Sequence, residues 1–210
     1  MQLSALPPPQ WGEVFGWRRP RYFMVLTERY QFEQYAAAYC RVSGNPMSVG
    51  YLERCDVVIG YYEADQMVGG FAFSTLERQA LRVFTELAPD QVGDLLRGHR
   101  LTAADLLEIA GFYIDGERAM IWDRLRMNLM LMRKAQELAT RLQKTHVVAG
   151  AFETGLQIEQ RKILTLMLYR NTTNLKKGRV VEIYAGHRNR LVPVGIWVIG
   201  QKLLKWLSHK

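Results

Sequence analysis

Cysteine is scarce in this chain of 210 residues, which has only Cys40 and Cys55. Two cysteines cannot form a disulfide framework, and this argues against a small secreted disulfide-rich fold. Long hydrophobic runs are also missing, since none reaches the length that spans a bilayer. The first ten residues lack the basic start and apolar stretch of a signal peptide. We therefore predict a protein of a reducing, cytoplasmic compartment.

Acidic residues are too few to balance the basic ones, and the formal charge is +8 with a pI of about 9.6. Such a charge attracts nucleic acid, anionic lipid or acidic proteins and cofactors. The basic residues are scattered, and no zinc-ligand pair, aromatic RNA-binding strand or helix-turn-helix accompanies them, so no nucleic-acid partner is predicted. His146 and His187 have no partners at metal-ligand spacing, and no metal is predicted.

Hydrophobic residues make up 49% of the chain, which is enough for a substantial core. Residues 1–20, with three prolines in a row, are predicted to be an N-terminal lead-in, and residues 21–200 one domain. Residues 201–210 are a short basic amphipathic tail. We expect this tail to pack on the body or on a second subunit, and weak contact with an anionic membrane surface is the alternative. The oligomeric state stays open.

The first half of the chain predicts antiparallel structure. A strand is expected at 21–27 and a helix at 29–42, with its apolar residues on one face. Residues 56–63 and 67–75 form a predicted hairpin around a short polar turn at 64–66. Pro89 and Gly98 are suited to start and stop a further helix.

The second half predicts a parallel crossover. A strand at 106–115 precedes an amphipathic helix at 118–142 and a buried strand at 145–152. A helix is then expected at 158–169 and a strand at 179–185. This order predicts an α/β protein with a mixed sheet, mostly antiparallel but with one parallel pair, and helices on both faces.

The strand at 106–115 carries the chemistry that we consider most informative. Glu108 is an acid in an apolar strand, where it is costly to bury unless it is paired or protonated. Gly111 predicts a bulge or the close approach of another backbone. The helix that follows offers free N–H groups and a positive dipole end to an anion. Glu108 is therefore a candidate site residue, and a half-exposed strand position is the alternative.

The order of elements resembles that of the GNAT superfamily of N-acyltransferases over most of the chain. The local matches are Val68–Gly69–Gly70–Phe71, the strand at 106–115, and Leu168–Tyr169–Arg170, which we place at the end of the late helix. The resemblance implies a GNAT-like sheet whose parallel strands splay apart, so that the pantetheine of an acyl donor pairs with strand backbone. It also implies no permanently bound cofactor, with acyl-CoA or an acyl-phosphopantetheine carrier as co-substrate.

Carried over residue by residue, the resemblance makes Glu108 the candidate general base and Tyr169 the candidate acid for the departing thiolate. The alternative for Tyr169 is a ring that covers the core. The residues expected to bind the donor are Gly111, Phe112, Tyr113, Ile114, Asp115, Arg118 and Ala119. The backbone N–H of Gly111 or Phe112 would polarise the thioester carbonyl.

The expected phosphate-binding turn departs from the family pattern, because residues 116–122 hold one glycine and a bulky tryptophan. This divergence is similar to the branch of acyl-homoserine-lactone synthases and long-chain N-acyl amino acid synthases, which take acyl groups from acyl carrier protein. Residues 108–115 resemble the E-x-x-R-F-x-V-D strand of that branch, but Gly111 stands in place of the arginine. A homoserine lactone product is therefore not predicted.

The resulting hypothesis is an N-acyltransferase that moves a medium or long acyl group from acyl-CoA or an acidic acyl carrier protein to a primary amine. The acceptor is a small molecule or a peptide. One alternative is an acetyl-CoA-dependent acetyltransferase with an atypical turn. The other is an inert GNAT-like module that binds a lipid or a carrier protein.

Overall fold

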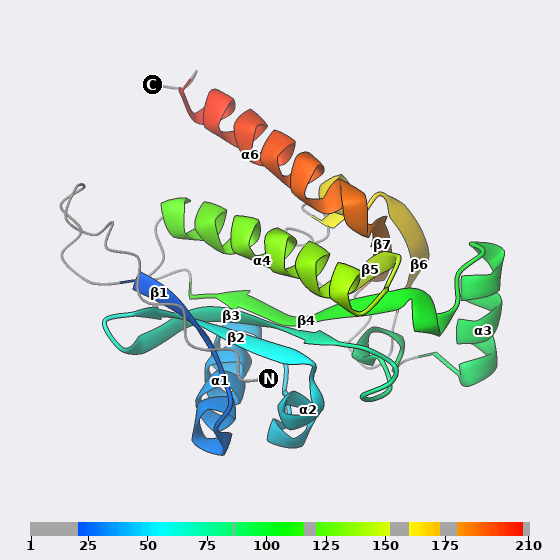
Figure 1. Cartoon of the computed structure of the whole chain (residues 1–210), viewed down its shortest axis with the longest axis horizontal. Helices are drawn as coiled ribbons and strands as arrows, with labels where there is room; N and C mark the ends of the chain where they lie inside the picture. The colour runs from blue at the N-terminus through cyan, green and yellow to red at the C-terminus, as the bar shows by residue number, and fades with distance from the viewer. Residues whose placement is uncertain (1–20, 86, 116–120, 152–159, 173–179, 208–210) are drawn as a thin grey trace. The chain divides into compact units, whose positions relative to one another are not determined.

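The computed structural model describes residues 21–85, 87–115, 121–151, 160–172 and 180–207. These residues form a seven-stranded sheet with the strand order β1-β2-β3-β4-β5-β7-β6. The sheet is mixed and mostly antiparallel, with one parallel pair, β4 and β5 (Figure 1). The fold class predicted from the sequence is confirmed.

The chain divides into two compact units. The first comprises the residues up to Ala72 together with Gly111–Met127, and the second comprises Phe73–Ala110 together with the residues from Asn128 onward. Both β4 (Leu106–Ile114) and α4 (Ile121–Arg141) contribute residues to each unit. The division thus falls inside regular elements and not at a linker. The single domain at 21–200 stays a prediction.

The first unit begins with the predicted strand, helix and hairpin. Strand β1 (Arg21–Val25) pairs antiparallel with β2 (Val57–Glu63), and β3 (Gln66–Ser74) follows. The two turn residues between β2 and β3, Ala64 and Asp65, have φ values of 46° and 66°. Positive φ at both central positions is what a two-residue hairpin turn of type I′ requires. The helices here are α1 (Arg29–Ser43) and α2 (Val49–Arg54).

Gly69 and Gly70 in β3 allow helices to pack on both faces of this strand. A Cβ atom at Gly70 would collide with the ring of Tyr35 in α1 and would lie 2.7 Å from the Ile59 carbonyl oxygen. At Gly69 a Cβ atom would lie 3.1 Å from the Met127 side chain in α4. Neighbouring strand residues point to opposite faces, so α1 and the start of α4 lie on opposite sides of β3.

The second unit contains most of the predicted crossover and three further strands, β5 (His146–Ala151), β6 (Leu166–Thr172) and β7 (Val180–His187). Strand β7 lies between β5 and β6 and is antiparallel to both. The prediction of a helix at 158–169 is wrong for its second half. Among the described residues of this range, only 160–163 are helical. Pairing with β7 outweighs a weak helical period, since short apolar runs suit either structure.

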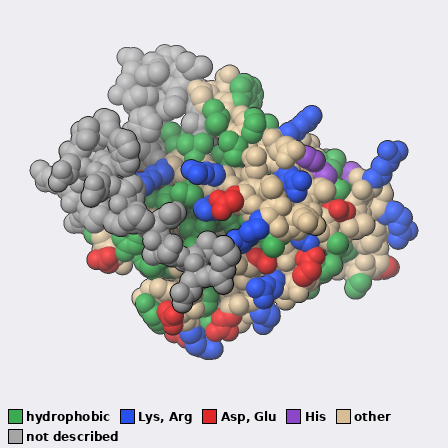
Figure 2. Space-filling view, in the orientation of Figure 1, with side chains coloured by type: hydrophobic (Ala, Val, Ile, Leu, Met, Phe, Trp, Pro, Cys, Tyr) green, Lys and Arg blue, Asp and Glu red, His purple; other side chains and the backbone are tan. Residues whose placement is uncertain are grey.

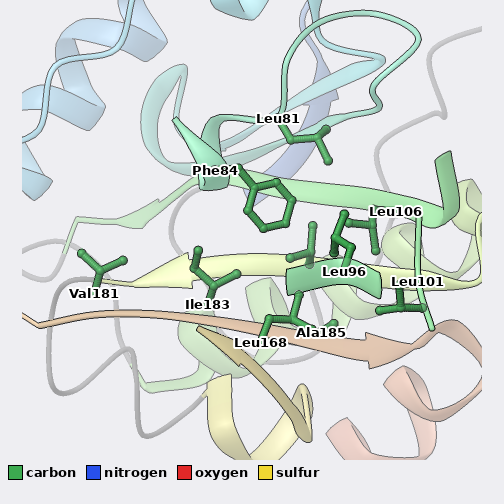
Figure 3. Packing of buried hydrophobic residues seen from close by; sticks show 10 residues of the cluster. Leu81, Phe84, Leu96, Leu101, Leu106, Leu168, Val181, Ile183 and Ala185 are labelled. Atoms are coloured by element: carbon green, nitrogen blue, oxygen red, sulfur yellow. The ribbon is translucent and has the colours of Figure 1, made fainter. Parts of the chain in front are cut away.

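A buried hydrophobic cluster fills one face of the sheet in the second unit. Leu106, Val148, Ile183 and Ala185 from the strands meet Phe84 and other side chains of the covering segments (Figure 3). These segments are the 3₁₀ helix η1 (Arg82–Phe84) and α3 (Pro89–Gly98), which starts and stops where the sequence predicted. Another 3₁₀ helix, η2 (Ala103–Asp105), leads into β4.

The last 3₁₀ helix, η3 (Arg188–Arg190), continues into α6 (Leu191–Leu207), which runs without a break through residue 200. Figure 1 shows α6 beside α4, and Gly195 makes the contact, because a Cβ atom there would collide with the Met132 side chain. In the described part of the chain, no helix combines the length and the apolar character needed to cross a membrane.

Candidate functional site

The parallel strands β4 and β5 pair over only three residues. The pairs are Leu106 with His146, Leu107 with Val147, and Glu108 with Val148. Strand β4 continues to Ile114 and β5 to Ala151, but the ladder does not follow them. The β4–β5 ladder therefore ends at Glu108 and Val148, and the splay of these strands stays a prediction.

Glu108 lies at the last pair of this ladder and is buried, with 2% of its surface exposed. Its two carboxylate oxygens accept hydrogen bonds from the backbone N–H groups of Arg82 (2.9 Å) and Val83 (2.6 Å). A Cβ atom on Gly150 of β5 would lie 2.9 Å from the Val83 side chain. Glu108 thus fastens η1 to β4, while Val83 packs on β5, at the last pair of the β4–β5 ladder.

In the first unit, Gly111 interrupts the extended backbone of β4 with φ +63°. Its carbonyl oxygen accepts a 2.7 Å hydrogen bond from the hydroxyl of Tyr35, which is fully buried. A Cβ atom at this position would lie 2.7 Å from Met47 Cε and 3.1 Å from the Tyr35 hydroxyl. The sequence-based expectation of an irregular strand at Gly111 is confirmed, and Tyr35 holds the irregularity in place.

Gly111→Ala is expected to lower the free energy of unfolding by about 2 kcal/mol, because a Cβ atom disfavours the left-handed region and meets Met47. The matched control is Gly50→Ala in α2, where the nearest atom to a Cβ lies at 3.5 Å. Chemical denaturation followed by fluorescence would measure both variants. Equal stability of Gly111→Ala and the wild type would contradict the strained geometry.

The remainder of β4 carries polar atoms into the first unit. Asp115 is buried and forms an ion pair with Arg41 at 3.4 Å. The ring of Tyr113 packs edge-on against Tyr35 and Tyr39, and burial raises the pKa of its phenol. The Tyr113 hydroxyl is buried and has no hydrogen-bond partner among the described residues. An unpaired buried hydroxyl is costly, so a polar ligand atom would stabilise this stretch.

A buried ion pair that sequence reasoning missed fixes the start of α4. Asp123, in the first turn, accepts hydrogen bonds from Arg21 of β1 and from the Tyr61 hydroxyl of β2, the latter at 2.9 Å. Arg21 also pairs with Glu63 at 2.9 Å. Burial, reinforced by the hydrogen bond to Asp123, raises the pKa of Tyr61. These contacts hold the N-terminal turn of α4 against the first two strands.

A second missed cluster surrounds Glu182 of β7 in the second unit. This carboxylate is 1% exposed and accepts hydrogen bonds from Arg161 and from the Tyr184 hydroxyl, with Arg170 at 3.2 Å. The available signal was a single acid within the apolar run RVVEIYA, the same signal that identified Glu108. Its arginine partners are distant in sequence and could not be named from the pattern.

The charged side chains of the described residues are spread over the face drawn in Figure 2. On the face drawn in Figure 2, Lys and Arg side chains are interspersed with acidic and apolar ones. No group of three or more His, Cys, Asp or Glu side chains that could hold a metal ion occurs in the described ranges.

Three comparisons bear on this geometry. No family model matches the sequence, and no curated protein matches it either. Among solved structures, the chain is similar to FeeM, an N-acyl amino acid synthase from uncultured soil microbes, with a TM-score of 0.59 and 10% identity. That match covers 83% of this chain and 92% of FeeM.

Two more solved structures extend the similarity. LasI, an AHL synthase, matches with a TM-score of 0.55 and 11% identity over 84% of this chain and 94% of its own. The yncA protein of Salmonella typhimurium, solved with its cofactor acetyl-CoA, matches with a TM-score of 0.51 and 12% identity over 80% and 94%. The chain has the GNAT fold. At these identities the similarity establishes the fold and not the substrate.

In this GNAT fold, Tyr169 lies elsewhere than predicted. The expected position was the end of a helix, but Tyr169 lies in β6, paired with Ile183 and packed against the buried cluster. That packing matches the alternative interpretation, in which the ring of Tyr169 covers the core. An acid role for Tyr169 stays a prediction, but its position at the end of a helix no longer supports that role. Arg118 and Ala119, in the predicted phosphate-binding turn, lie outside the described residues.

Proposed function

We propose that this protein is an N-acyltransferase that uses a phosphopantetheine thioester, acyl-CoA or acyl carrier protein, as donor and a primary amine as acceptor. The observation that carries the proposal is the β4–β5 ladder that ends at Glu108 and Val148. A pantetheine arm contains amide groups, which can form hydrogen bonds with strand backbone beyond the end of a ladder. The GNAT fold supports this proposal, as does the similarity to an N-acyl amino acid synthase, FeeM, and an AHL synthase, LasI.

The proposed reaction is a direct transfer without a covalent enzyme intermediate. The amine nitrogen attacks the thioester carbonyl carbon, the carbon–sulfur bond breaks, and the thiolate departs. A backbone N–H of Gly111 or Phe112 would stabilise the charge on the carbonyl oxygen, since the left-handed residue turns the backbone at this point. Positioning of the two reactants supplies much of the rate enhancement.

The amine must lose a proton, and Glu108 is the proposed acceptor, directly or through water. Its two oxygens accept the backbone N–H groups of Arg82 and Val83, which fix the carboxylate at the last pair of the β4–β5 ladder. The proton would then be passed on to the departing thiolate, with Tyr169 as the proposed acid. The donor-binding residues proposed on β4 are Gly111, Phe112, Tyr113, Ile114 and Asp115, and Arg118 and Ala119 are proposed to contact its phosphates.

We also propose a medium or long acyl group in preference to acetyl. The support is the turn at 116–122, which departs from the glycine-rich pattern of acetyl-CoA users, together with the long-chain branch that the sequence resembles. The second candidate is an acetyl-CoA-dependent acetyltransferase, favoured by the similarity to yncA with its bound acetyl-CoA.

Native mass spectrometry with acyl-CoAs from acetyl to palmitoyl, and with acylated carrier protein, would test the donor. We expect a bound complex whose affinity rises with chain length, and thiol release when a panel of primary amines is added. Unacylated CoA is the control. Binding of none of the donors would overturn the proposal, while binding without thiol release for any amine would identify an inert binding module.

A further inference from the structure

The outward face of α6 is apolar at a place where a surface helix normally carries polar residues. Leu191, Gly195 and Val198 are buried and recur at helical spacing, so they form the inward face of α6. Its other face presents Ile196 and Trp197, which are 57% and 61% exposed. Two large neighbouring apolar side chains in contact with water point to a surface that another molecule covers.

The composition of the first ten residues of α6 agrees with that exposure. The segment 191–200 reads LVPVGIWVIG and contains no charged residue. At the rise of an α-helix it is about 15 Å long, which is half of the hydrocarbon thickness of a bilayer. An apolar stretch of this length suits either a buried core or the interface between a membrane and water. Burial in the core does not account for the exposed face at Ile196 and Trp197.

Positive charge lies on both sides of this apolar segment in the sequence. Arg188 and Arg190 come just before it, and Lys202 and Lys205 come just after it. Glu182 is the last acidic residue of the chain, so no negative side chain offsets these charges in the sequence that follows. Basic residues next to an apolar helix face attract anionic lipid headgroups.

A lipid surface fits this face better than a second copy of the chain does. A twofold dimer places the same patch of both subunits face to face, and here it would bring basic segments together. An acidic protein would match the charge alone. Trp197 beside aliphatic residues, on a helix flanked by Lys and Arg, is the pattern of helices that lie in the membrane interface, where the indole ring sits at the level of the headgroups.

We propose that α6 docks this protein on an anionic lipid bilayer. The helix would lie in the plane of the interface, with Ile196 and Trp197 at the boundary of headgroups and acyl chains. The flanking positive charge would face the anionic headgroups. Such attachment is peripheral and reversible, and it weakens as salt screens the charges. It goes beyond the proposed acyl transfer and does not depend on it.

Flotation of the full chain with lipid vesicles would test this surface. The vesicles are phosphatidylcholine alone, or phosphatidylcholine with about one third phosphatidylglycerol. We expect the wild type to bind the anionic vesicles about tenfold more tightly than the neutral ones at low salt. Replacing both exposed residues, Ile196→Ser with Trp197→Ser, should weaken binding to the anionic vesicles about tenfold, because the apolar contact is lost.

Leu76→Ser is the matched control, since it removes another exposed apolar side chain, 46% accessible, in the segment that follows β3. It should bind the vesicles like the wild type. Urea denaturation should give the double variant the stability of the wild type, because both replaced side chains are mostly exposed. Trp197→Ser alone is the second variant and should show a smaller loss of binding.

Two results would overturn the lipid surface: a wild type that does not float with anionic vesicles, or binding that the double serine variant retains. A wild-type dimer in analytical ultracentrifugation that the double variant converts to a monomer, without vesicle binding, would assign the face to a second copy. Binding of an acidic carrier protein that the double variant loses, again without vesicle binding, would assign it to a protein partner. Donor binding and thiol release are measured without vesicles, so they stand or fail separately.

Discussion

Gly70→Ala is expected to lower the free energy of unfolding by about 3 kcal/mol or more, because the added methyl group has no space. It would collide with the ring of Tyr35 and lie 2.7 Å from the Ile59 carbonyl oxygen. Tyr35 cannot move away easily, since it is fully buried and its hydroxyl donates to the Gly111 carbonyl. Backbone of the neighbouring strand cannot yield without breaking the sheet.

The same substitution should disturb the proposed donor site. Tyr35 holds Gly111 and packs edge-on against Tyr113, so its displacement would loosen the irregular part of β4. Urea denaturation would measure the stability, and native mass spectrometry the donor affinity. Gly98→Ala at the end of α3 is the control, because nothing lies within 4 Å of its Cβ position and no loss is expected. A Gly70→Ala variant as stable as the control would contradict the packing of α1 on β3.

Glu108→Gln should lower the free energy of unfolding by about 2 kcal/mol. The carboxylate accepts hydrogen bonds from the backbone N–H groups of Arg82 and Val83. The NH₂ group of a glutamine cannot accept a hydrogen bond, so one of these N–H groups would lose its acceptor. We expect η1 to loosen from β4 at the end of the β4–β5 ladder, and acyl transfer to slow together with the loss of stability. Glu137→Gln on α4, an exposed position in a surface pair with Lys134, is the matched control and should cost little.

Stability and the pH dependence of turnover together separate two roles for Glu108. If it accepts the proton of the amine, Glu108→Gln should abolish the acidic limb of the pH–rate profile. If it only positions η1, the limb should remain at a lower overall rate. Unchanged stability with reduced turnover would contradict the structural contact, and unchanged turnover would remove Glu108 from the catalytic proposal.

Local sequence patterns were sufficient to predict the elements whose residues interact with close neighbours in the chain. The β2–β3 hairpin follows from two apolar runs around a short polar turn, and α3 from Pro89 at its start and Gly98 at its end. The β4–α4–β5 order follows from an amphipathic helix between two apolar strands. These signals also led to Glu108 and Gly111, since an acid and a glycine are conspicuous within an apolar strand.

Tertiary pairing decided what those local signals could not. Residues 166–169 have an acceptable helical spacing, and only the neighbouring β7 makes them a strand, which moves Tyr169 onto the buried cluster. The bulge at Leu168 determines that Arg170 pairs with Glu182. No pattern in the sequence predicts this shift of one residue in the β6–β7 register. Which groups satisfy a buried charge depends on register between distant segments. The sequence alone thus determined the order of elements from β1 to β5, apart from the short α2, and singled out Glu108. Strand register made residues 166–172 a strand and selected the partners of Glu182.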